Sequence, residues 1–138
     1  MTIAALGFPM NIRDLLRTHP DLFESKVKEV YWMNGFYNFG CAQGFFLGST
    51  EDCDGAAEEV QDKIPHTIKQ YFQLNGEDVC IGDDFYWHKC GETNNPVAAA
   101  YRNWMARSRD ICWPARPSWD PLTVFAAIVG AEGAGMSA

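Results

Sequence analysis

The chain has little positive charge. Lys and Arg together number 11 among 138 residues, against 18 Asp and Glu, which gives a formal net charge of −7. Proteins that bind the phosphate backbone of nucleic acids use clustered basic side chains that displace counterions. This sequence has no such cluster, so we predict no nucleic-acid partner. The charge balance does not argue against a neutral ligand such as a nucleoside.

Long apolar runs are also missing. Apolar residues form 47% of the chain, which is enough for a folded core. No run, however, approaches the length that a membrane-spanning helix needs, so we predict a soluble protein without a membrane span. The opening segment Met1–Gly7 is apolar, but it is short and has no basic flank. It therefore does not resemble a signal peptide, and the compartment stays open.

Several common signatures of metal and catalytic sites are absent. The five cysteines include no Cys-x-x-Cys pair, so Cys80, His88 and Cys90 form only a weak zinc pattern. Free thiols and one or two disulfides are both open alternatives. The acidic segment 51–54 lacks the alternation and the glycine position of an EF-hand loop. No Ser/His/Asp order or phosphate-binding loop stands out.

What the sequence does contain is an alternation of strand-like and helix-like segments. Turn residues such as Asn-Gly, Gly and Pro separate these segments. The expected strands are Thr2–Leu6, Val27–Met33 and Thr67–Leu74, with a short strand at Asp78–Ile81. The first expected helix is capped by Asn11 and ends at His19-Pro20, and a turn follows at 21–24. Further helices are expected at Gly55–Ile64, Asn95–Met105 and Asp120–Val129. Loops are expected at 36–50, 83–93 and 106–118.

This order predicts an α/β fold with a partial, open, mainly parallel sheet and flanking helices. We expect one domain over residues 1–132 and a flexible tail over 133–138. Binding sites in such sheets lie beyond the carboxyl ends of the strands. The turns at Gly7, Asn34 and Gly76 are therefore expected to share one edge.

Three polar residues are the strongest site candidates. Asp120 precedes Pro121 at the start of an apolar helix, where a carboxylate acts either as a helix cap or as an oxygen ligand for a divalent cation. Asn34 and Asn38 flank the aromatic pair 36–37 after the strongest predicted strand. Their amides can hold adjacent sugar hydroxyls, because an amide offers both donor and acceptor. Simple turn chemistry is the alternative for both asparagines.

Taken in order, five segments resemble the middle and the carboxyl-terminal part of a nucleoside hydrolase. Residues 4–11 are similar to the family's strand that ends in Gly-Pro-Leu-Thr-Asn, and Val30–Gly35 to its strand that ends in Met-Gly-Gly. Residues 37–40 resemble the Glu-Phe-Asn sugar loop, and residues 54–57 the Asp-Pro-Glu-Ala-Ala helix start. Ser118–Leu122 resembles the late motif that supplies a calcium-binding Asp.

The resemblance implies a nucleoside hydrolase-like fold and hydrolysis of the N-glycosidic bond of ribonucleosides. In that family a calcium ion holds the ribose diol and the attacking water, and the transition state resembles an oxocarbenium ion. By position, Asp120 would bind calcium through its carboxylate and Leu6 through its backbone carbonyl. Met33 and Asn38 would face the ribose, with Asn34 a further substrate-binding candidate.

Departures from the family pattern limit the expected activity. The family's amino-terminal Asp-rich motif, which supplies further calcium ligands and the general base, has no counterpart in these residues. Phe36 stands where the sugar loop has Glu, and Trp119 where the late motif commonly has His. We therefore assign no catalytic residue and expect an inactive domain as this chain alone. Either a further segment or second chain completes the sheet and the metal site, or the domain serves as a non-catalytic interaction subunit.

Overall fold

The computed structural model describes residues 1–33, 56–72, 75–82, 95–107 and 112–136. The chain divides into two compact units. Met1–Leu74 together with Asp120–Ala138 form the first, which we call the sheet unit. Asn75–Trp119 form the second, which we call the disulfide unit.

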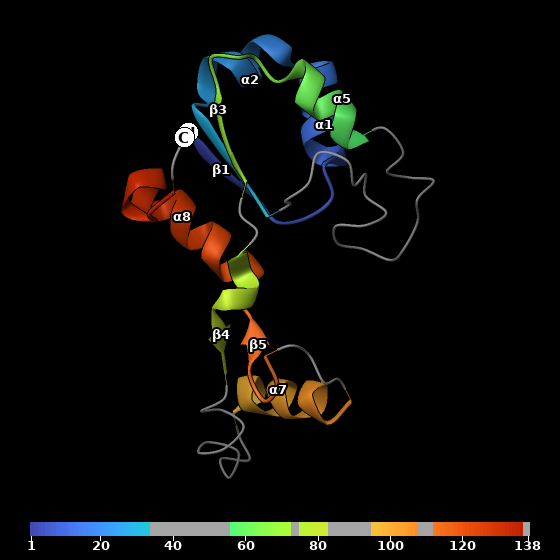
Figure 1. The fold of residues 1–138 in the computed structure, drawn as a ribbon. Helices are drawn as coiled ribbons and strands as arrows, with labels where there is room; N and C mark the ends of the chain where they lie inside the picture. The colour runs from blue at the N-terminus through green and yellow to red at the C-terminus, as the bar shows by residue number, and fades with distance from the viewer. Residues whose placement is uncertain (34–55, 73–74, 83–94, 108–111, 137–138) are drawn as a thin grey trace. The chain divides into compact units, whose positions relative to one another are not determined.

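The described residues of the sheet unit form a sheet of three strands in the order β1-β2-β3. They are β1 (Thr2–Ala5), β2 (Glu29–Trp32) and β3 (Lys69–Phe72). Both neighbouring pairs are parallel, so that Ala5, Trp32 and Phe72 lie in register at the carboxyl ends. This arrangement confirms the predicted mixed α/β class with a small parallel sheet (Figure 1).

Helices α1 (Met10–Thr18), α2 (Pro20–Lys26) and α5 (Ala56–Lys63) cover one face of this sheet. Side chains alternate between the two faces of a strand, and Val30 and Trp32 of β2 point into this layer. Phe23 of α2 and Val60 of α5 meet them at 1% exposure each. The buried cluster is Ile12, Leu16, Phe23, Val27, Val30, Trp32, Val60, Ile64 and Ile68.

The start of α1 differs from the sequence prediction. Pro9, not Asn11, occupies the cap position, and it forms no side-chain cap. The Asn11 amide oxygen instead accepts a hydrogen bond from the Ile12 N–H at 2.9 Å, inside the first helical turn. Proline suits a helix start because its fixed φ is already helical and it has no N–H to satisfy. The predicted turn at 21–24 is a seven-residue helix, α2, that begins with Pro20.

Helix α8 (Trp119–Gly133) packs on the opposite face of the sheet. Tyr31 and Tyr71 stack there with ring centroids 4.8 Å apart, and Ala126 of α8 packs against them. A small residue at this contact lets the helix lie close to two large rings. Burial, the largest cause, raises the pKa of the Tyr31 phenol. The helix was predicted to end at Gly130, and this glycine does break it, with φ 83° and ψ 163°.

The described residues of the disulfide unit form four short elements. It has a short 3-10 turn η1 (Asn75–Asp78), strand β4 (Cys80–Ile81), helix α7 (Pro96–Arg107) and strand β5 (Arg116–Pro117). The antiparallel β4–β5 pair lies partly in a segment that was predicted to be loop. The start of α7 agrees with the sequence prediction, because the Asn95 amide oxygen accepts hydrogen bonds from the Val97 and Ala98 N–H groups at 2.9 and 3.2 Å.

Candidate functional site

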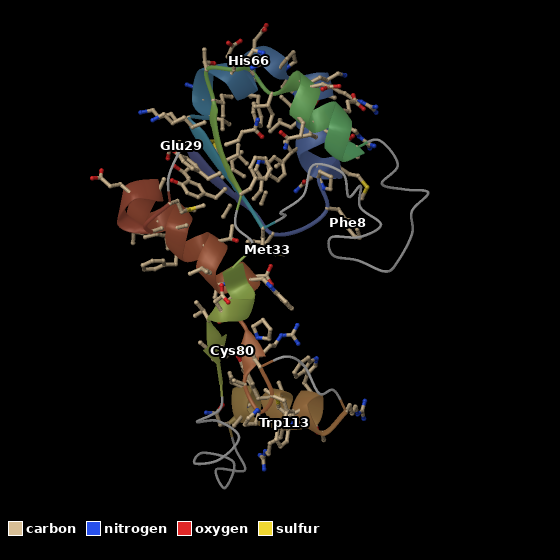
Figure 2. The ribbon with its side chains drawn as sticks, in the orientation of Figure 1. Phe8, Glu29, Met33, His66, Cys80 and Trp113 are labelled. Atoms are coloured by element: carbon tan, nitrogen blue, oxygen red, sulfur yellow. A yellow bond between two sulfur atoms is a disulfide. The ribbon has the colours of Figure 1, made fainter. Side chains whose placement is uncertain are left out.

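The carboxyl edge of the parallel sheet brings two of the predicted site residues together. The Met33 N–H donates to the Ala5 carbonyl at 2.9 Å, which extends the β1–β2 ladder one residue beyond β2. Leu6 follows Ala5, so Leu6 and Met33 lie on adjacent strands at this edge. Figure 2 shows Met33 at the opposite end of β2 from Glu29. The carboxyl ends of β1 and β2 therefore lie at one edge; the predicted common edge for the turns at Gly7, Asn34 and Gly76 stays a prediction.

The two residues at this edge differ in accessibility. Met33 is buried at 4% exposure, and Leu6 is partly buried. The backbone carbonyl of Leu6 is the group that the resemblance assigns to calcium, and it lies just beyond the last paired residue of β1. Asn34 and Asn38 fall outside the described residues. Gly76 belongs to the disulfide unit.

Asp120 lies in the first turn of α8 and is partly buried. A carboxylate at this position interacts favourably with the helix dipole, so the position suits both a helix-stabilising residue and a cation ligand. Within the described ranges, no group of three or more His, Cys, Asp or Glu could hold a metal ion. One carboxylate and one carbonyl do not fill the six to eight positions of calcium. The described donor set therefore does not fit this ion by itself.

A charged cluster elsewhere in the sheet unit connects α1 to α5. Arg17 Nε donates to Glu59 Oε1 at 2.7 Å, Arg17 also contacts the second Glu59 oxygen, and Lys63 Nζ donates to Oε1 at 2.6 Å. These hydrogen bonds lower the pKa of Glu59 to about 2, and the one from Arg17 has the largest effect. Arg17 lies on α1 and Glu59 and Lys63 on α5, so these ion pairs connect the two helices.

The outer side of α8 is a feature that the sequence interpretation did not single out. Four apolar side chains are exposed there, at 36% for Val124, 50% for Phe125, 78% for Ile128 and 42% for Val129. We call these four residues the α8 face. The apolar character of this helix can be read from the sequence, because residues 121–131 contain no charged side chain. A helix that is apolar on all sides is normally buried on all sides.

Searches against models of protein families, curated proteins and solved structures find no match to this chain. In the described part of the chain, no helix combines the length and the apolar character needed to cross a membrane.

Proposed function

We propose that this chain is a nucleoside hydrolase-like α/β domain that presents one part of a ribonucleoside site. The order of the five family-like segments supports this proposal. The observation that carries it is the parallel register of β1 and β2, which places Leu6 beside Met33 at the carboxyl edge of the sheet. Ligands of open parallel sheets bind at this edge.

In this proposal the chain binds the sugar and contributes only part of the metal site. The Leu6 carbonyl and the Asp120 carboxylate are the calcium ligands that it would supply, and Asn34 and Asn38 would hold the ribose hydroxyls. The remaining ligands and the general base would come from residues outside these 138. In this proposal the chain alone is inactive, because the family's Asp-rich motif has no counterpart among its residues.

The test is calcium-dependent release of base from inosine or uridine. We expect no release by the 138-residue chain and measurable release by the complete gene product with its natural partners. Asp120→Ala should abolish that release. Asp21→Ala is the matched control, since Asp21 also lies in the first turn of a helix in the sheet unit, and this variant should retain activity. Full turnover by the Asp120→Ala protein, or by the short chain alone, would contradict the proposal.

The α8 face favours a second candidate function, that of a non-catalytic interaction subunit. Exposed apolar patches with polar surroundings mark protein interaction sites. We propose a second copy of this chain as the occupant. The chain carries a net charge of −7, so most of its surface repels a second copy. The α8 face is uncharged, and two such helices can pack across a two-fold axis without bringing like charges together.

The oligomeric state tests this second function. We expect a dimer by native mass spectrometry and sedimentation velocity, and we expect Ile128→Lys to yield a monomer. Burying one Ile side chain contributes roughly 1.5–3 kcal/mol, so losing two across a symmetric interface weakens the dimer at least about 100-fold. Leu22→Lys is the control, because Leu22 is an apolar residue with 51% exposure on a different helix, α2. A wild-type monomer at high concentration would refute self-association.

A further inference from the structure

A covalent bond connects the two parts of the disulfide unit. Cys80 of β4 and Cys112, in the turn before β5, form a disulfide with Cα atoms 5.6 Å apart and 32 residues apart in sequence. The bond lies next to the β4–β5 pair, where Cys80 is opposite Pro117. Sequence spacing alone left the pairing of the five cysteines open, because no pattern distinguishes this pair.

The described residues of this unit form short strands and a small core. Each strand has two residues. The buried apolar residues among its described positions include Ala98, Met105, Cys112, Ala115 and Pro117, and most of them are small. Arg116 stacks on the Trp104 ring at 4.3 Å, but cation–π contacts at partly exposed sites contribute little. A unit of roughly 45 residues is close to the size below which disulfides or metals are usually needed.

We propose that the Cys80–Cys112 disulfide is a redox-sensitive lock on the disulfide unit. A disulfide that closes a loop of this length lowers the conformational entropy of the unfolded unit. The equilibrium constant for opening the unit therefore falls by a few hundred-fold. Reduction should therefore open the disulfide unit. The sheet unit has its own core on both faces of a parallel sheet and should stay folded. In this proposal the disulfide unit closes only where thiols are oxidised.

The reducing step is a thiol–disulfide exchange with an external dithiol. Cys80 is exposed and Cys112 is buried, so the attacking thiolate reaches the Cys80 sulfur first. A mixed disulfide forms there, the Cys80–Cys112 bond breaks, and Cys112 leaves as a thiolate that takes up a proton. The second thiol of the reductant then closes its own disulfide and releases Cys80 as a thiol. Two electrons pass from the dithiol to the protein.

Hydrogen exchange with mass spectrometry on the whole chain, with and without dithiothreitol, tests the lock. We expect peptides from α7 and β5 to lose protection by at least about 100-fold on reduction. Peptides from β2 and α1 should keep theirs. Unchanged protection in α7 after complete reduction would overturn the proposal. Equal loss of protection in β2 would overturn it too, because the lock would then not be confined to one unit.

A double variant separates this bond from the other cysteines. Cys80→Ser/Cys112→Ser keeps Cys41, Cys53 and Cys90, and without reductant it should show the open pattern in α7. Adding dithiothreitol to this variant should change α7 no further. Wild-type protection of α7 in the oxidised double variant would show that the bond does not hold the unit. Should the variant fail to fold, titration of the wild-type chain with dithiothreitol still decides the question.

Discussion

Substituting Gly76 by alanine should disrupt the disulfide unit selectively. A Cβ atom built on Gly76 would lie 2.3 Å from Trp119 Cδ1, 2.5 Å from Trp119 Cα and 2.6 Å from Trp119 N. Two of these atoms belong to the backbone, so a rotamer change of the Trp119 side chain cannot relieve the overlap. The backbone is also fixed, because the Ser118 N–H donates to the Gly76 carbonyl at 2.8 Å. Relief requires the two segments to separate and this hydrogen bond to break.

The expected cost follows from these contacts. Overpacking in a close-packed site costs about 1–3 kcal/mol, and a clash with backbone belongs in the upper part of that range. The opening equilibrium of the unit should then rise by roughly 30- to 150-fold. Hydrogen exchange of α7 and β5 peptides measures this change directly. Gly7→Ala is the matched control, since nothing lies within 4 Å of its added Cβ, and it should leave exchange unchanged. Wild-type protection in Gly76→Ala would refute the contact geometry.

Three further predictions concern the sheet unit. Phe23→Ala should lower its free energy of unfolding by about 3–5 kcal/mol because Phe23 is 1% exposed; Leu22→Ala, measured in the same urea titration, should change it little. Glu59→Gln should lower the urea midpoint at neutral pH but not near pH 2. The lowered pKa of Glu59 stabilises the fold above about pH 4.5, and this contribution is lost as the pH falls toward about 2. A difference in urea midpoint that does not change with pH would contradict the assignment. Because the pKa of Tyr31 is raised, the free energy of unfolding of the wild type should fall as the pH rises above about 10. In alkaline denaturation of Tyr31→Phe, this fall should be shallower.

The elements of the sheet were predictable because their sequence signals are local. Dense β-branched and aromatic residues identified β2, and Asn95-Pro96 identified the start of α7. Boundaries failed where a backbone hydrogen bond to the preceding turn or helix takes up the first residue of a predicted strand. Val27 was predicted to start a strand, but its N–H donates to the Phe23 carbonyl at 2.8 Å and so ends α2 instead. Ile68 likewise bonds back to Pro65 at 2.9 Å, which delays β3 to Lys69.

Contacts between segments distant in sequence could not be predicted in the same way. Nothing local indicates that Cys80 pairs with Cys112 or that two-residue strands meet there. The neighbourhood of Leu6 and Met33 did follow from the sequence, because parallel strands of predicted length end at a common edge. The exposed α8 face was missed because an apolar helix in a sequence is ordinarily assigned to the core on all sides.

The central claim is that the carboxyl edge of the parallel sheet faces a ribonucleoside, and chemical-shift mapping tests it most directly. Amide resonances of the isotopically labelled chain would be followed during titration with inosine in the presence of calcium. We predict shifts that saturate at millimolar inosine and that centre on Leu6, Met33 and Asp120, while amides of α2 stay unmoved. An absence of shifts at these three residues, or shifts confined to the disulfide unit, would contradict the account.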